Sequence, residues 1–155
     1  MRRVHITCAM KNLFGAIAYS RKVKYHPILE EAIVGINKIL KPHVNVVDGI
    51  VALGRYPYKL SLVMAGTSTF AVDSVASQIM GYKPSQISFL SLAAKEQLGN
   101  FRDVTVVGEE IEPFRRVFPH ENNFGARIKT SLQFSMIRGY SRIVGDIVPP
   151  SIEDS

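Results

Sequence analysis

Short apolar segments alternate with longer segments of helical periodicity along residues 3–107. Four segments have the length and pattern of strands: 3–9, 44–47, 60–65 and 104–107. Three others repeat apolar residues at helical spacing: 28–40, 67–81 and 86–97. This alternation predicts an α/β fold with a layered sheet that is at least partly parallel and is flanked by helices.

The helix predicted at 67–81 has the clearest boundaries. Thr67 or Ser68 supplies an N-cap, because a side-chain oxygen at that position accepts from the first amides of a helix. Apolar residues then recur at i, i+3, i+4 and i+7 from Val72. Gly81 suits the end of the helix, since glycine adopts the left-handed backbone that commonly follows a last turn.

The length of 155 residues is that of one domain. We therefore expect a single α/β domain at 1–148, followed by a disordered tail at 149–155. Within the domain, 10–27 and 113–125 lack a sustained period and are expected to be loops, the first with a short helical turn at most. A basic amphipathic helix is expected at 126–144.

Cysteine content and hydropathy exclude several classes of protein. Cys8 is the single cysteine, which excludes an internal disulfide framework and any all-cysteine metal or iron–sulfur site within this chain. A lone thiol fits a reducing compartment. No segment approaches the roughly 20 apolar residues that span a bilayer. We therefore expect a cytoplasmic protein that makes no membrane contact.

Positive charge is concentrated in two parts of the sequence. Residues 1–29 contain lysines and arginines but no acid, and they account for the net charge of +6. A second basic region lies at 113–145. A diffuse basic excess of this kind is common in proteins that bind no polynucleotide. From this distribution of charge we do not expect nucleic-acid binding, and RNA binding is only the third hypothesis.

The first basic region contains the groups of an anion-binding site. Lys11 and Asn12 offer a cation and an amide, and Gly15 lets the backbone approach a ligand. Lys22 adds a second cation, and His26 could donate or transfer a proton. The alternatives are a solvated basic loop and, for the histidine, a hydrogen-bonded residue that precedes a helix.

Two aspartates are candidates for acid–base chemistry. Asp48 follows the strand at 44–47, and Asp73 lies in the helix that follows the strand at 60–65. Because parallel strands present their carboxyl ends at one edge of a sheet, both are expected near that edge. Asp48 could equally be a turn residue, and Asp73 a solvated helix residue. The histidines show no metal-ligand spacing, so no metal site is predicted.

Five segments in a fixed order resemble a known family. They are Ala9–Gly15, then Lys22 with Tyr25-His26, Val46–Ile50, Ala65-Gly66 with Ala71–Ala76, and Met80-Gly81. Over about residues 4–110 this order resembles the domain-of-unknown-function 362 family. The resemblance implies that six residues are the family's marked positions: Lys11, Asn12, Gly15, His26, Asp48 and Asp73.

The same resemblance bears on cofactors and partners. Members of the family are typically longer, and many carry a ferredoxin-like module that binds four-iron–four-sulfur clusters. This chain resembles the later portion of such a domain. With one cysteine it has no cluster motif of its own, so an iron–sulfur cluster is expected only in a partner chain or a missing module.

The leading hypothesis is an anion-binding α/β domain of a redox-associated family that acts on or with a small anionic ligand. Lys11 and Asn12 would hold the anion and His26 would donate or transfer a proton, while Asp48 and Asp73 would orient these groups or a metal. The alternative is a non-catalytic assembly module whose basic face docks an acidic, ferredoxin-like protein. In either case we expect a homo-oligomer, because a sheet edge near the N-terminus would be exposed.

Overall fold

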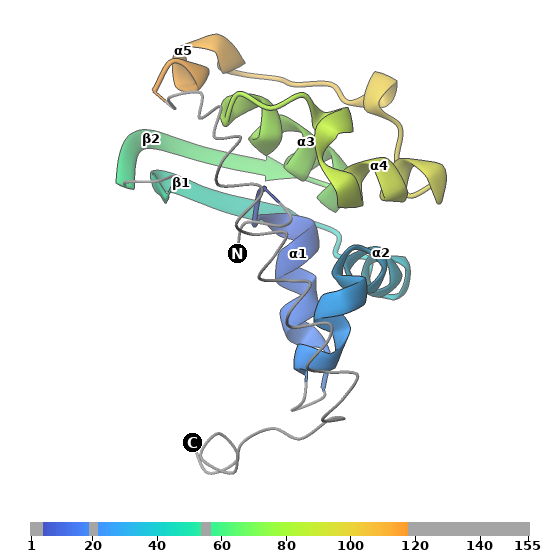
Figure 1. Ribbon diagram of the computed structural model, residues 1–155. Helices are drawn as coiled ribbons and strands as arrows, with labels where there is room; N and C mark the ends of the chain where they lie inside the picture. The colour runs from blue at the N-terminus through green and yellow to red at the C-terminus, as the bar shows by residue number, and fades with distance from the viewer. Residues whose placement is uncertain (1–4, 19–21, 54–56, 118–155) are drawn as a thin grey trace, which may run out of the picture.

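The computed structural model describes residues 5–18, 22–53 and 57–117 (Figure 1). Five α-helices and two strands are formed in these ranges: α1 Ala9–Leu13, α2 Leu29–Ile39, β1 Asn45–Leu53, β2 Pro57–Gly66, α3 Thr69–Ile79, α4 Ser88–Lys95 and α5 Ile111–Arg115. Short 3-10 helices connect them: η1 Phe14–Ala16, η2 Lys22–Ile28, η3 Pro84–Gln86 and η4 Phe101–Asp103. The mixed helix and sheet content agrees with the sequence, but the type of sheet does not.

The sheet is a two-stranded antiparallel hairpin rather than a partly parallel layer. Asn45 pairs with Gly66 at one end of the hairpin and Leu53 pairs with Pro57 at the other. The register shifts between Gly49 and Val51, where an extra residue makes an irregularity of the β-bulge kind. A parallel sheet would need a further strand on one side of the hairpin, and the described part of the chain supplies none.

The predicted strand at 3–9 is wrong over the residues that are described. His5 has a φ of 56°, which interrupts an extended backbone, and α1 begins at Ala9. Residues 10–27, expected to be a loop, hold the rest of α1 and both η1 and η2. Apolar residues of this part of the chain are buried, but not in a strand. Ile6 and Met10 both lie in the core, where Ile6 precedes α1 and Met10 lies within it.

The predictions for the C-terminal part also need correction. Residues 104–107 form no strand: Val104 packs against the core, whereas Val106 and Val107 are exposed. A loop is predicted from residue 113, but residues 113–115 belong to α5. Pro113 is tolerated there because it occupies the first turn of the helix. The remainder of that loop, the helix predicted at 126–144 and the tail at 149–155 lie outside the described residues.

The three longer helices are confirmed. The segment 28–40 contains α2 and the segment 86–97 contains α4. In α3 the Ser68 side chain accepts from the Ala71 amide at 3.3 Å, as the predicted N-cap should. Gly81 has a φ of 81°, and the Tyr82 amide donates to the Ser77 carbonyl at 2.9 Å, which closes the helix with a Schellman-type turn.

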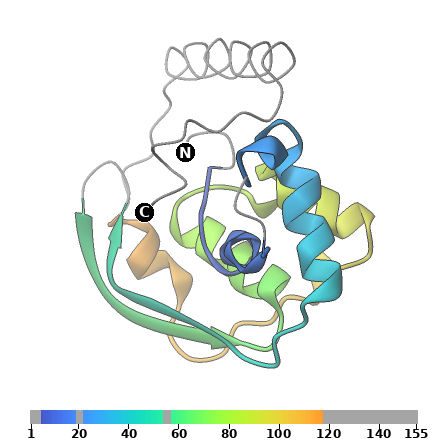
Figure 2. The ribbon, with the colours of Figure 1, turned by 90° about the horizontal axis from the view of Figure 1, so that it is seen from below.

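Two groups of apolar side chains meet at α3. The larger lies between α1, α2, α3 and α4 and includes Met10, Ile33 and Phe89. The smaller lies beneath the hairpin, where Leu60 packs against Val75 and other residues of α3 and α5. Figure 2 shows α1 end-on among the helices and the hairpin as a curved wall with the helices on its concave side. α3 is thus packed against both α1 and the sheet, which allows it to position residues of α1.

Candidate functional site

The buried aspartate Asp73 holds the N-terminus of α1. Its side chain is fully buried on α3, and its two carboxylate oxygens accept from the Ala9 amide at 2.6 Å and the Met10 amide at 3.1 Å. The first amides of a helix have no partner within the helix, so a carboxylate placed there satisfies them and interacts favourably with the helix dipole. The cap of α1 therefore comes from a residue more than sixty positions away in the sequence.

Burial changes the acid–base behaviour of this carboxyl. It raises the pKa of Asp73 to about 7, although the two amides and the Cys8 thiol act in the opposite direction by hydrogen bonding. Burial and the Asp73 charge together raise the pKa of Cys8 to about 12. At neutral pH the thiol therefore stays protonated, which makes it a poor nucleophile. The carboxyl, in contrast, gains and loses its proton near physiological pH.

The same helix is held from its other side by Asn37, a buried residue of α2. The Asn37 Nδ2 donates to the Met10 carbonyl at 2.9 Å and to the Ile33 carbonyl at 2.8 Å. Its Oδ1 accepts from the Thr69 hydroxyl at 2.9 Å, at the start of α3. The sequence analysis missed Asn37. The available signal was an amide on the apolar face of the predicted helix at 28–40, which needs a partner when buried.

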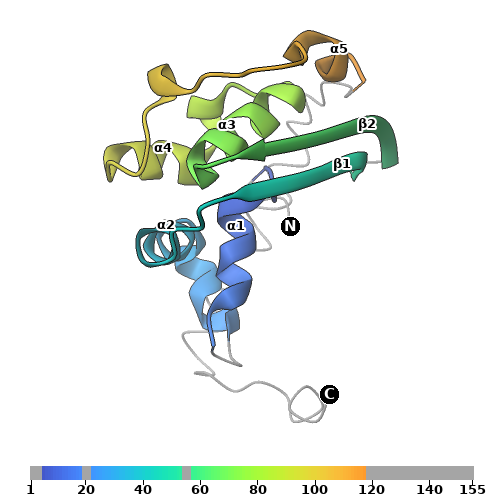
Figure 3. The same ribbon diagram turned by 180° about the vertical axis from the view of Figure 1, so that it is seen from behind.

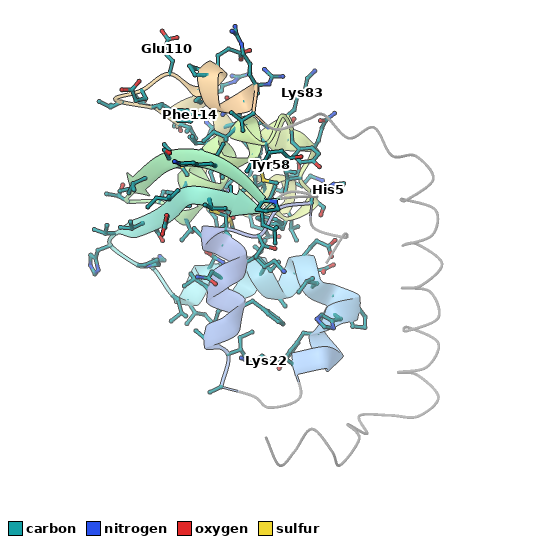
Figure 4. The ribbon with its side chains drawn as sticks, turned by 90° about the vertical axis from the view of Figure 1, so that its left-hand side faces the viewer. His5, Lys22, Tyr58, Lys83, Glu110 and Phe114 are labelled. Carbon is teal, nitrogen blue, oxygen red and sulfur yellow. The ribbon has the colours of Figure 1, made fainter. Side chains whose placement is uncertain are left out.

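Three basic side chains gather around α1 and η2, and we call Lys11, Lys22 and His26 the α1–η2 basic cluster. The Lys22 Nζ donates to the Gly15 carbonyl at 2.6 Å, and the Lys11 Nζ donates to the Thr7 hydroxyl at 3.1 Å. All three side chains are half-buried. Figure 4 shows Lys22 at the end of the molecule that carries α1, far from Lys83 beyond α3. Lys11 and His26 thus lie close enough to interact electrostatically, whereas Lys22 lies beside Gly15, beyond the C-terminus of α1.

The pKa values of two members of the cluster, Lys11 and His26, are shifted by their surroundings. Burial lowers the pKa of Lys11, and burial together with the positive charge of Lys11 lowers the pKa of His26. Both shifts disfavour the cationic form, so a negative charge placed between the two groups would oppose them. Asn12 is exposed on the next position of α1 and adds an amide to the same end.

The other aspartate, Asp48, lies in a different part of the molecule. It is exposed within β1, pairs with Val63 across the hairpin, and accepts from the Ile50 amide of its own strand at 2.9 Å. The prediction that Asp48 ends a strand is wrong, because β1 continues to Leu53. The structure thus gathers the basic residues around α1, places Asp73 beneath the N-terminus of that helix, and leaves Asp48 on the hairpin.

Comparison with models of protein families gives a match. The model of the family described as "Domain of unknown function (DUF362)" matches residues 2–78. The chain belongs to the DUF362 family. Comparison with curated proteins and with solved structures gives no match. The DUF362 match includes α1, the basic cluster, the hairpin and nearly all of α3, so each predicted site residue lies within it.

Other features of this DUF362 chain bear on what the site can hold. Within the described ranges, no three side chains of histidine, cysteine, aspartate or glutamate are arranged to hold a metal ion. A surface depression of about 410 Å³ is lined by Ala94 of α4, Asp103 of η4 and the segment between them, and by none of the predicted site residues. No described helix has both the length and the apolar character needed to cross a membrane.

Proposed function

We propose that the α1–η2 basic cluster binds a small anionic ligand of the phosphate or carboxylate type. The observation that carries the proposal is the electrical coupling of Lys11 and His26 in a half-buried setting. An anion bound there would interact favourably with Lys11 and would favour protonation of His26. The Lys22 ammonium is held by the Gly15 carbonyl, beyond the C-terminus of α1, and it adds positive charge that attracts an anion at longer range.

Each residue has a defined role in this proposal. Lys11 and Asn12 hold the anion by a charged and a neutral hydrogen bond. The imidazole of His26 is mostly neutral at pH 7, since its pKa is lowered from 6.5. Binding of an anion raises that pKa, so the histidine takes up a proton that it can then donate to the ligand. Asp73 acts as a positioning residue, because it fixes the start of the helix that carries Lys11.

The same cluster suits the alternative of an assembly module. Carboxylates on an acidic, ferredoxin-like protein would meet the same three basic side chains, and any iron–sulfur cluster would then belong to that partner. A cytoplasmic location is part of both versions, and the free thiol of Cys8 supports it. The two versions differ in the size of the ligand, which a binding experiment resolves.

The test is calorimetric titration of the protein with inorganic phosphate and, separately, with an acidic ferredoxin. We expect phosphate to bind, and Lys11→Ala to weaken that binding about 10-fold or more, the loss of one charged hydrogen bond. Lys83→Ala is the matched control, because Lys83 is exposed at the opposite end of the molecule. Equal effects of the two substitutions, or no binding by the wild type, would contradict the anion site.

The outcome with larger ligands separates the other hypotheses. Binding of the acidic protein without binding of phosphate would favour the assembly module. RNA binding would instead weaken steeply between two salt concentrations, because several phosphate contacts release counterions together. It would also respond to substitutions throughout the basic regions, whereas anion binding should depend on the α1–η2 basic cluster alone.

A further inference from the structure

The outer face of the hairpin is an exposed apolar surface. Side chains alternate along each strand, so Leu60, Leu62 and Met64 point toward α3 and α5 while their neighbours point away. We define the outer face by the residues that point away in both strands: Val46, Asp48, Val51 and Leu53 in β1, and Pro57, Lys59, Ser61, Val63 and Ala65 in β2. Figure 3 shows the two strands from behind, side by side along their whole length.

The exposure of this face is large for apolar side chains. Val46, Val51, Leu53 and Val63 are between 58% and 77% exposed, and they lie on two adjacent strands rather than singly. Contiguous apolar surface of this kind marks an interaction site in a folded protein. We therefore expect another protein surface to bind to this face.

The charges on the outer face indicate what covers it. β1 contains one charged residue, Asp48, and β2 contains one, Lys59. They do not pair with each other across the hairpin, since Asp48 is opposite Val63 and Lys59 is opposite Val51. The outer face thus carries one acidic residue, Asp48, and one basic residue, Lys59, at different positions among mostly apolar side chains. Such a face is complementary to a copy of itself turned by a two-fold rotation.

We propose that the outer face packs against the same face of a second copy of this chain. A two-fold axis midway between Asp48 and Lys59, perpendicular to the line that joins them, brings each Asp48 opposite Lys59 of the second copy. The apolar side chains of the two hairpins then meet as the layers of a sheet-on-sheet interface. The charge pairs fix the register of the two copies, and the apolar contacts supply most of the affinity.

The interface is independent of the proposed anion site. It uses residues of the hairpin alone, whereas the α1–η2 basic cluster lies at the end of the molecule that carries α1. Failure of one proposal therefore leaves the other standing. The interface also gives Asp48 a role other than acid–base chemistry.

Sedimentation equilibrium over micromolar concentrations tests the proposal. The wild type is expected to sediment with about twice the 17.2 kDa mass of one chain. Asp48→Lys and Lys59→Asp should each weaken dimerisation by about 10-fold or more, because every dimer then contains two like-charge contacts. The double variant D48K/K59D restores opposite charges, so it should return to within about threefold of the wild type.

A second pair of variants separates the apolar contribution from nonspecific effects. Val63→Glu should abolish the dimer, since it places a charge in the apolar centre of the interface. Val107→Glu is its matched control, because Val107 is more exposed but lies outside the hairpin. Thermal unfolding monitored by circular dichroism checks that each variant folds. A monomeric wild type, a dimer that survives Val63→Glu, or a double variant that does not recover would each overturn the proposal.

Discussion

Two regions of the molecule, α1 and the hairpin, are stabilised by different kinds of contact. α1 has only five residues, too few to be stable alone, and buried polar side chains from α2 and α3 fix it at both its amide and its carbonyl groups. The hairpin has its own ladder of hydrogen bonds but leaves one face apolar and exposed. Contacts within the chain therefore account for the order of the α1 region, whereas the outer face of the hairpin stays exposed in the single chain and is the surface for which we propose a partner.

The largest expected effect is that of removing the Asp73 carboxylate. Asp73→Leu fills similar space but leaves the Ala9 and Met10 amides buried without acceptors. We expect a loss of about 3 kcal/mol in the free energy of unfolding, measured by urea denaturation. Asp103→Leu removes an exposed aspartate of η4 instead and should change that free energy by less than about 0.5 kcal/mol. Similar losses in the two variants would break the comparison.

Asn37 should follow Asp73 in magnitude. Asn37→Leu removes donors to the Met10 and Ile33 carbonyls and leaves the Thr69 hydroxyl without its acceptor. The expected loss in the free energy of unfolding is about 2 kcal/mol, again by urea denaturation. Asn12→Leu, at an exposed position of α1, serves as the control and should be nearly neutral. A neutral Asn37→Leu would show that the amide is not needed to hold α1.

A change of one pH unit is expected to have a smaller effect than either substitution. The folded-state pKa of Asp73 lies above its ordinary value, at about 7, so the folded state binds this proton more tightly than the unfolded state does. The resulting stabilisation is complete below about pH 4 and is lost as the pH rises through 7. Relative to Asp73→Asn, the wild type should lose up to about 1 kcal/mol of unfolding free energy per pH unit in that window. A wild type whose unfolding free energy rises relative to that of Asp73→Asn as the pH increases would contradict the shift.

The reactivity of Cys8 gives a finer probe of the same site. Because burial and the Asp73 charge raise the pKa of Cys8, its thiol should react with iodoacetamide at pH 8 at least 100-fold more slowly than a free cysteine. Asp73→Asn removes the charge and should speed the reaction severalfold. The rate is followed by mass spectrometry. A wild-type rate equal to that of free cysteine would show that the start of α1 is open.

How far the sequence could predict this structure depends on where each signal lies. α3 was predictable because its cap, its apolar period and its terminal glycine are all local. α1 was not, since its cap is contributed by Asp73 on α3. A short apolar segment also has no local signal that distinguishes a strand from a buried turn, which explains the errors at 3–9 and 104–107.

The candidate site shows the same division. The basic residues could be selected from the sequence because they occur close together between residues 11 and 26, and the structure gathers them around one helix. Asp48 and Asp73 were expected to meet because a parallel sheet would have aligned the ends of two strands. An antiparallel hairpin removes that reason. Asp73 is the more informative residue, since it positions α1 from within the core.

The titration of His26 tests the α1–η2 basic cluster most directly. Its pKa can be followed by NMR in the wild type and in Lys11→Met. The account predicts that the pKa of His26 lies below 6.5, rises part of the way back in Lys11→Met, and rises in the wild type when phosphate is added. An unchanged His26 pKa under both conditions would contradict the cluster and the anion site built on it.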